Sequence, residues 1–373
     1  MQNAMKITRI LIMSSLAAGL TLAACSCEKE VTFHRDDIEA QLQMNAQMCV
    51  GDTVHAVYLA VSRDVRIENI SSGSVTCFIN GEKAADGVQD NSPDQTFFKE
   101  GSAAVGGLAP SYARQTRFTF KADFHPGDIV RIEATANGGA CKAYSEVTVP
   151  YAPAISIADT VCQQNPAVNY SDKVYRIKIQ GQDIKEENSF YRLTADYERK
   201  DDLYCDWDWV SEDERHLVNR RSDGLRIDKG NDPILQDGAP AEDIDLTGAS
   251  ENIYNVFSDR LFKDGSFSIV FSVDPDFVQM PTGYAYQYAE SDITFNARVW
   301  GISEGEYNYL KALSIYDYTG GDATFTEPVS FPDNVEGGVG FVSISTPSTA
   351  SVKFTRHFSL DDDIYTGDGQ DGQ

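Results

Sequence analysis

The chain carries little positive charge for its size. Lysine and arginine together number 31 against 57 aspartates and glutamates, which gives a net charge of −26 over 373 residues. Proteins that bind nucleic acid without sequence preference need clustered lysines and arginines to displace counterions from the phosphates, and no such cluster occurs here. The same acidity repels anionic lipid surfaces. We therefore expect no nucleic-acid partner.

Recognisable catalytic signatures are also missing. The sequence contains no H-E-x-x-H zinc-protease pair, no G-x-S-x-G nucleophile elbow and no G-x-x-x-x-G-K-[ST] phosphate loop. Its five histidines lie far apart, and its carboxylates are too numerous for a glycosidase pair to stand out. The stretch Asp243–Gly248 begins like a calcium loop, but Tyr254 stands where an EF-hand needs a bidentate glutamate. We expect no enzyme, no catalytic residue, no cofactor and no metal site.

One long apolar run occurs, at the start of the chain. A positively charged stretch, residues 1–9, precedes the apolar segment 10–20, as in a secretory signal. The run is too short to span a bilayer, which takes about 20 apolar residues. It ends in Leu22-Ala23-Ala24-Cys25, which resembles a lipobox, and so Cys25 is expected to receive a lipid after removal of residues 1–24. The alternative is an ordinary cleaved signal followed by a structural cysteine.

The remaining cysteines agree with export but do not define a disulfide pattern. Six cysteines allow 15 pairings, and their long spacings without any C-x2-C pair argue against zinc. Pairing in an oxidising compartment and burial as free thiols both stay open. These residues are Cys27, Cys49, Cys77, Cys141, Cys162 and Cys205.

Alternation of apolar and polar residues predicts a mostly β chain. Leu42 to Val50 alternates as a half-buried strand does, and residues 53–61 are apolar on both faces, as expected of a central strand. Asn80-Gly81 and Asn137-Gly138-Gly139 are hairpin turn signals. After a lipidated tether at residues 25–38, we therefore expect an N-terminal antiparallel, Ig-like β-sandwich over residues 39–150.

A second β-rich domain is predicted over residues 151–358, after the break at Pro150-Tyr151-Ala152-Pro153. It contains one short helix, because Ser303-Glu304-Gly305-Glu306 fits a capping box. The polar, acidic stretch at about 201–250 shows little periodicity, which favours an insertion of loops over a separate domain. Residues 359–373 form an acidic tail expected to be disordered.

The acidic stretch holds the candidate binding residues Asp206, Trp207, Asp208 and Trp209. An extended segment places both tryptophans on one face, beside carboxylates that can hydrogen-bond sugar hydroxyls. Exposed rings would bind a glycan or a protein partner, because aromatic side chains dominate binding energy where they lose water. The alternative, which the pattern favours, is that both rings fill the core of the second domain. The segment Asp201–Glu214 is the candidate contact surface.

Short motifs occur along nearly the whole chain. They are Pro126-Gly127-Asp128, Ala143-Tyr144-Ser145-Glu146, Glu187–Arg192, Phe257-Ser258-Asp259, Ser303–Leu310 and Asn334–Gly340. In this order they resemble a Bacteroidetes lipoprotein family catalogued as domain of unknown function 4249, although Val130 and Phe190 replace tyrosines of the family pattern. The resemblance implies an outer-membrane lipoprotein with a sandwich-like first half. It also implies a TonB-dependent outer-membrane receptor as a partner, and it supplies no catalytic residues.

The location on the cell is expected from the residues after Cys25. Ser26 is not the aspartate that favours retention in the inner membrane, and Glu28-Lys29-Glu30 resembles the charged surface-export tether of this phylum. We expect an outer-membrane, lipid-anchored protein on the cell surface, which binds a partner or ligand without catalysis. The alternatives are a structural adhesin or pilus-like subunit and a glycan-binding surface protein.

Overall fold

The structure is a computed structural model that describes residues 39–63, 66–90, 115–164, 173–183, 189–205, 208–237, 252–278, 286–318 and 330–359. Most of these residues form strands, and the expectation of a mostly β fold is confirmed. Neither helix of this part of the chain is long and apolar enough to cross a membrane. Cys25, the signal at residues 1–24 and the segment Asp243–Gly248 lie outside the described residues.

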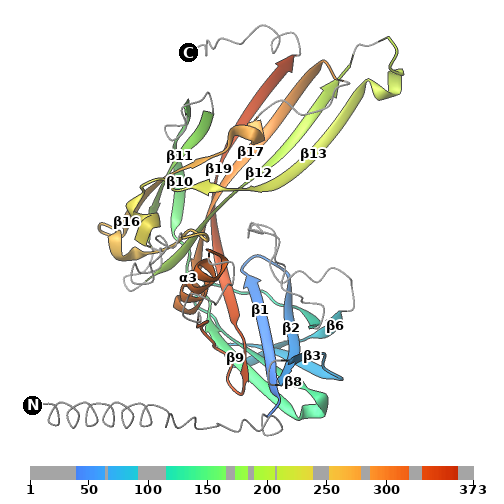
Figure 1. Cartoon of the computed structure of the whole chain (residues 1–373), viewed down its shortest axis with the longest axis vertical. Helices are drawn as coiled ribbons and strands as arrows, with labels where there is room; N and C mark the ends of the chain where they lie inside the picture. The colour runs from blue at the N-terminus through green and yellow to red at the C-terminus, as the bar shows by residue number, and fades with distance from the viewer. Residues whose placement is uncertain are drawn as a thin grey trace, which may run out of the picture. The chain divides into compact units, whose positions relative to one another are not determined.

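The first half of the chain contains short strands joined by the expected turns (Figure 1). Asn80 and Gly81 both adopt positive φ between two strands, as the Asn-Gly hairpin signal predicts. The strands are β1 (Gln41–Cys49), β2 (Val54–Arg63), β3 (Arg66–Glu68), β4 (Gly73–Ile79), β5 (Glu82–Asp86), β6 (Val88–Asp90), β7 (Thr116–Lys121), β8 (Ile129–Ala136) and β9 (Cys141–Thr148).

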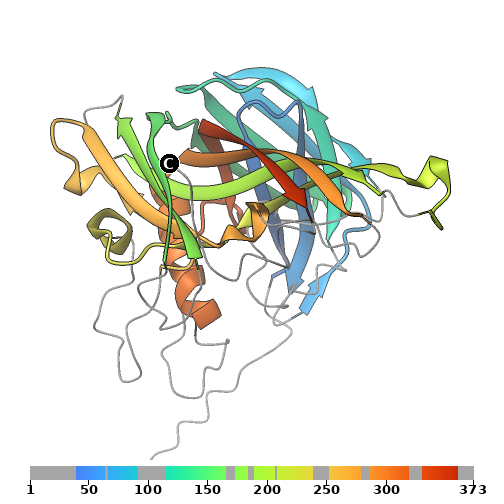
Figure 2. The same ribbon diagram turned by 90° about the horizontal axis from the view of Figure 1, so that it is seen from above.

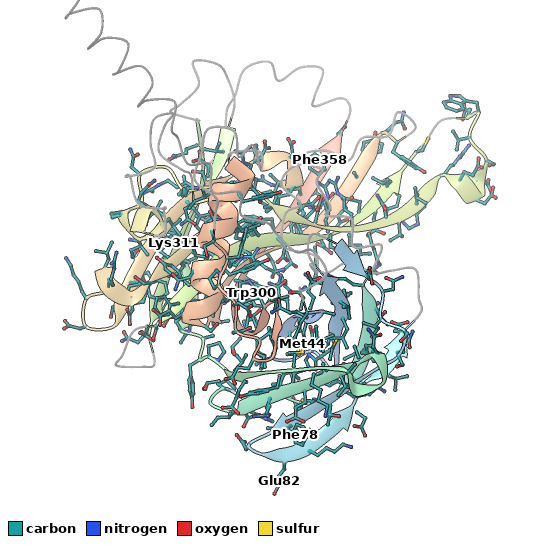
Figure 3. The ribbon with its side chains drawn as sticks, turned by 60° about the horizontal axis from the view of Figure 1, so that its bottom comes forward. Met44, Phe78, Glu82, Trp300, Lys311 and Phe358 are labelled. Carbon is teal, nitrogen blue, oxygen red and sulfur yellow. The ribbon has the colours of Figure 1, made fainter. Side chains whose placement is uncertain are left out.

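Two sheets enclose the first core. One has the order β5-β4-β8-β9, and the other contains β1, β2, β7 and β6. Alternate residues of β1, among them Leu42 and Met44, are fully buried, and side chains of β8 such as Ile132 meet them in one cluster. Figure 3 shows Met44 within this sandwich. The expected N-terminal sandwich is therefore confirmed.

The described residues of the second half form long strands, a few very short ones and two α-helices. They are β10 (Ala154–Gln164), β11 (Lys173–Gln182), β12 (Phe190–Tyr204), β13 (His216–Leu225), β14 (Ile227–Asp228), α2 (Pro233–Asp237), β15 (Val256–Ser258), β16 (Ser266–Val273), β17 (Tyr288–Ile302), α3 (Glu304–Tyr318), β18 (Gly338–Val339) and β19 (Val342–Ser359). A second core lies between β12 and β17 on one side and the sheet β10-β11-β16-β14 on the other, with residues such as Ile177, Ile269 and Phe295 fully buried.

β19 belongs to both halves. Val342–Ser345 pairs with β1 in parallel, and the rest of the strand pairs with β17 in the antiparallel sense. Val342 and Ile344 are part of the first core, so the first sandwich takes strand residues from near the end of the chain. The sequence leads us to expect a purely antiparallel first half, and the parallel pairing of β1 with β19 differs from this expectation. The boundary at Pro150 stays a prediction.

Gly301 marks a close approach of two strands beside this boundary. A Cβ atom at this position would lie 2.0 Å from the carbonyl oxygen of Tyr151, a distance that only glycine avoids. Nearby, the Thr346 hydroxyl donates a hydrogen bond of 2.6 Å to the Pro150 carbonyl. A close backbone approach at Gly301 and a side-chain hydrogen bond from Thr346 therefore join the segment after β9 to β17 and β19.

The helix expected after Ser303 is α3, and the serine half of its predicted capping box is confirmed. The Glu306 amide donates to the Ser303 hydroxyl at 3.1 Å, while Tyr307 and Leu310 are buried. The other half of the capping box is different, because the Glu306 carboxylate is buried and accepts hydrogen bonds from Ser345 at 3.0 and 3.1 Å.

The acidic stretch differs from the loops that we expect there. Over the described part of residues 201–250, β13 forms a ten-residue antiparallel ladder with the end of β12, and α2 follows. Every residue of β13 before Leu225 is exposed, so neither face shows the apolar alternation that identifies a strand from sequence. Figure 2 shows the end of the β12–β13 hairpin projecting from the sheet.

The cysteines that the structure describes include Cys77, Cys141 and Cys162 as free thiols. Cys77 lies in the first core, and burial raises the pKa of its thiol to about 12. The alternative of burial as a free thiol therefore holds for Cys77, whereas Cys141 is half-buried and Cys162 is exposed. Cys27 lies outside the described residues.

Candidate functional site

Three rings form a row across the sheet where β12 ends. Tyr204 lies directly opposite His216 of β13 and opposite Tyr288 of β17. The rings of Tyr204 and His216 are stacked, with centroids 4.6 Å apart. Tyr204 and Tyr288 are 41% and 43% exposed. This row lies on the face of β12 that points away from the second core, because the alternate residues Asp201 and Leu203 are buried.

Trp209 follows Tyr204 along the chain, beyond the end of β12. It lies in the connection between β12 and β13 and is 73% exposed. Thirteen large hydrophobic side chains are exposed in the described residues, and five of them are at this end of the sheet: Tyr204, Trp209, Leu217, Val218 and Tyr288. Tyr204, Val218 and Tyr288 share one face of the sheet, and gathered apolar surface of this kind is typical of interaction sites, whereas single exposed residues are not. We name Tyr204, Trp209, His216 and Tyr288 the aromatic end.

Hydrogen bonds hold the connection that carries Trp209. The Cys205 amide donates to the Arg215 carbonyl at 2.9 Å and closes the hairpin. The Arg215 side chain then donates to the Val210 carbonyl at 3.1 Å, and the Ser211 hydroxyl donates to the Glu214 carboxylate at 2.7 Å. Trp209 is therefore presented by a hydrogen-bonded turn, which lowers the entropy lost when a partner covers the ring.

Asp202 balances the charges beside the aromatic end. Its carboxylate accepts a hydrogen bond from Lys200 at 2.5 Å and lies 3.2 Å from the His216 ring nitrogen. The hydrogen bond from Lys200 is the main reason that the pKa of Asp202 is below its usual value, and His216 acts in the same direction. The carboxylate is therefore ionised at neutral pH, with the Lys200 ammonium group beside it.

The predicted binding residues have different outcomes. Trp209 is exposed, so the interpretation that its ring fills the core is wrong. Asp208 is exposed beside it. Asp206 and Trp207 lie outside the described residues, so the pairing of the two tryptophans stays a prediction.

Sequence reasoning misses Tyr204, His216 and Tyr288 as members of one surface. They are distant in sequence and come together only through the register of β12 with β13 and β17. The tyrosines carry a weak signal, since each stands at a strand end on the face that alternates with buried residues. His216 carries none, because β13 has no apolar face.

A fully buried ion pair lies in β12 close to the aromatic end, where a binding partner cannot contact it. Arg199 donates to Asp201 at 2.5 Å and to Ser291 at 2.9 Å, and both charged side chains are fully buried. Arg199 also donates to the Phe277 carbonyl at 3.0 Å. These bonds give the Arg199 guanidinium the partners that a buried charge requires, whereas the Asp201 Oδ2 atom is buried without a hydrogen-bond partner. The pair supports the strand that presents Tyr204.

Glu306 is the centre of a second buried polar cluster, at the other end of β12. Burial raises the pKa of its carboxyl, while hydrogen bonds from Ser345 and the charge of Arg192 oppose the shift. Arg192 in turn lies over the Tyr254 ring, whose hydroxyl donates to Asp317 at 2.5 Å. This cluster joins α3 to β12 and β19. We interpret it as a structural element, because its carboxylate is 2% exposed at most.

The short motifs of the sequence meet in space at such joints. Arg192 ends one motif and Glu306 belongs to another, and the two charges interact. Tyr144 and Glu336, from a motif of each half, exchange backbone hydrogen bonds of 3.0 and 2.8 Å, and the Tyr144 hydroxyl donates to the Glu336 carboxylate. The Tyr144–Glu336 contact therefore joins the two halves, the Arg192–Glu306 contact joins elements of the second half, and no motif contributes a residue to the aromatic end.

No three His, Cys, Asp or Glu side chains gather in a metal-binding arrangement within the described ranges. The fold and this surface together define a mostly β protein of two joined sandwiches with an exposed aromatic end. Residues 28–351 match the family described as Domain of unknown function (DUF4249), and the chain belongs to this family. The resemblance seen in the short motifs is confirmed at the level of the domain family.

Among solved structures, the chain is similar to a crystal structure of a DUF4785 family protein from Legionella pneumophila subsp. pneumophila. The identity is 7% and the TM-score is 0.22, over 70% of this chain and 52% of that chain. This chain therefore spans about half the length of that protein. A TM-score this low says nothing further about fold or function. No curated protein matches the chain.

Proposed function

We propose that this chain is a noncatalytic lipoprotein of the bacterial outer membrane that binds a protein partner through the aromatic end. The observation that carries the proposal is the 73% exposure of Trp209 in a hydrogen-bonded turn, beside the exposed rings of Tyr204 and Tyr288. Water around such rings is released on binding, and fully desolvated aromatic side chains supply most of the energy of many interfaces.

The envelope location and the kind of partner rest on the sequence. Leu22-Ala23-Ala24-Cys25 supports a lipid anchor, and Ser26 supports the outer membrane. Resemblance to the Bacteroidetes lipoproteins supports a TonB-dependent receptor as the first partner to test. A receptor-associated role also agrees with the acidic surface, which keeps the chain away from anionic lipid and leaves aromatic contact as the source of affinity.

The test is affinity purification of the full-length lipoprotein from membranes, in its native form and as Trp209→Ala. We expect an outer-membrane receptor to co-purify with the native protein and to be lost with the variant. Val88→Ala is the matched control, because Val88 is 69% exposed in β6, far from β12 in strand order. Equal recovery of partners with Trp209→Ala and the native protein would contradict the proposal.

The anchor is tested separately with Cys25→Ser. We expect this change to abolish labelling by radioactive palmitate and to release the protein from the membrane fraction. Labelled lipid that persists in Cys25→Ser would show that another residue carries the anchor.

A further inference from the structure

β13 is the edge strand of its sheet, and one side of its backbone faces away from β12. The order begins β13-β12-β17, so β13 has a partner on one side within the described residues. Residues 216–224 are exposed on both faces of the strand. An edge of this length presents a row of unpaired amide and carbonyl groups, to which another extended chain can add.

The register shows which residues direct these groups outward. The Cys205 amide donates to the Arg215 carbonyl, and Leu217, Asn219 and Arg221 follow at the alternate positions of the ladder. In an antiparallel pair, residues at such positions exchange both backbone hydrogen bonds with the partner strand. The intervening residues, among them Val218, Arg220 and Ser222, therefore point their amide and carbonyl groups to the open edge.

Two arginines give this edge a charge opposite to that of the whole chain. Arg220 stands directly opposite Lys200, and Arg221 stands directly opposite Arg199. Like charges at opposed positions destabilise a sheet. The two β12 residues already donate hydrogen bonds to carboxylates, Lys200 to Asp202 and Arg199 to Asp201. Neither Arg220 nor Arg221 forms an ion pair with a carboxylate of the described residues, and Arg221 lies over the Tyr197 ring with 5.8 Å to the centroid.

The acids on β13 and beside it leave these arginines available. Asp223 accepts a hydrogen bond from the Gly224 amide at 2.8 Å. Glu198 stands opposite Ser222, two positions from Arg220 along the ladder. Two carboxylates therefore lie near the two arginines, but the guanidinium groups remain open for bidentate contact with an incoming carboxylate.

Protection of the edge is the simpler explanation for these charges, because charged residues on edge strands discourage aggregation. It does not account for Leu217 and Val218, which are 47% and 44% exposed on opposite faces of the same edge. Edge protection also does not require like charges at two consecutive positions of the ladder, Lys200 with Arg220 and Arg199 with Arg221. A single charged residue on β13 would protect the edge with less electrostatic repulsion. Apolar contact combined with selection by charge fits a binding edge better.

We propose that the β13 edge binds an extended, acidic segment of a partner protein, which adds to the sheet as a further strand. The backbone of Val218, Arg220 and Ser222 would supply the hydrogen bonds, and the guanidinium groups of Arg220 and Arg221 would select carboxylates. This inference rests on the proposed function. It names the chemistry of a second segment of the same partner protein, which binds the β13 edge next to the aromatic end.

The direct test uses synthetic peptides and the purified full-length chain without its lipid. One peptide has two glutamates at its centre, flanked by valines and threonines, and the other has two lysines in their place. We expect the acidic peptide to bind and the lysine peptide not to bind, in fluorescence anisotropy at low salt. Binding of both peptides with equal affinity, or of neither, would overturn the proposal.

Ser222→Pro tests strand addition without disturbing the hairpin. Proline removes an amide that points to the open edge and leaves the ladder to β12 intact, and edge strands tolerate proline for this reason. We expect roughly tenfold weaker peptide binding for Ser222→Pro and unchanged binding for Ser222→Ala. Arg220→Gln with Arg221→Gln should remove the preference for glutamate even if the proline variant folds poorly. A preference that survives the glutamine changes would overturn the assignment of these residues.

The failure of this inference is distinguishable from failure of the proposed function. If receptor recovery depends on Trp209 but not on Ser222 or the two arginines, the aromatic end binds and the edge does not. If peptide binding shows the expected charge preference while Trp209→Ala keeps its partner, the edge is the site and the aromatic end is not.

Discussion

The two ends of β12 have the same alternating pattern but opposite surroundings. At the start of the strand, α3 covers Phe190 and Arg192, and the Glu306 carboxylate is buried against them. At its end, Tyr204 is exposed between His216 and Tyr288. Figure 3 places Trp300 and Lys311, beside and on α3, at the covered end.

Residues at the covered end of β12 are therefore expected to contribute to stability, and residues at the aromatic end to binding. Burial makes an unpaired charge costly, and at the covered end the Glu306 carboxylate accepts hydrogen bonds from Ser345 of β19 and faces the charge of Arg192. The aromatic end loses nothing of this kind when a ring is removed, because water already reaches the rings. Substitutions at the two ends should therefore affect different measurements.

The largest expected effect is at the covered end. Arg192→Met removes the charge that faces Glu306 and leaves a buried carboxylate without its cation, and we expect the free energy of unfolding to fall by about 3 kcal/mol. Urea denaturation followed by circular dichroism measures this change. The folded fraction should keep its partner, and a variant that unfolds at the native urea midpoint would contradict the structural role of the cluster.

Trp209→Ala should have the next largest effect, on binding alone. Loss of a central aromatic contact weakens an interface by roughly 2 kcal/mol, and removal of an exposed ring should change the melting temperature little. Titration with the purified partner and differential scanning calorimetry give the two numbers. A sharp fall in melting temperature with unaltered affinity would show that the ring packs within the fold.

A smaller effect is expected from Tyr204→Ala. The change removes the ring between His216 and Tyr288, and cross-strand aromatic pairs contribute up to about 1 kcal/mol to a sheet. Both binding and stability should therefore decrease slightly. Tyr204→Phe, which keeps the ring, is the control and should resemble the native protein in both measurements.

The smallest expected effect is a dependence of stability on pH through Glu306. Burial raises the pKa of the folded carboxyl above its ordinary value of 4.5, so the folded chain binds a proton more tightly than the unfolded chain. The resulting stabilisation is complete below the ordinary value and is lost as the pH rises through the raised pKa. Relative to Glu306→Gln, the native protein should become less stable across this range in urea denaturation. An opposite slope would show that Glu306 is held as a stabilising anion.

The alternation of apolar and polar residues predicts the strands that have one solvent-exposed face. The alternation from Leu42 to Met48 identifies β1, and Asn80-Gly81 identifies a hairpin, because both signals lie within a few residues. The parallel pairing of β1 with β19 has no local signal. It joins residues as distant as Asn45 and Phe341, whose hydrogen bond of 3.1 Å spans 296 positions.

The candidate site divides in the same way. Trp209 stands out in the sequence because tryptophan is rare and acids flank it, but its exposure depends on a turn that composition does not reveal. β13 escapes prediction because a strand exposed on both faces has no apolar period. Tyr204, His216 and Tyr288 form a row through register alone, which is a long-range property of the sheet.

Site-specific photo-crosslinking in living cells tests the central claim most directly. A photoreactive phenylalanine analogue placed at position 209 should form one major adduct with an outer-membrane protein, since the ring is exposed at the aromatic end. The same analogue at position 88 should form none. Adducts at position 88 but not at position 209, or no adduct at 209 in folded and lipidated protein, would contradict the account.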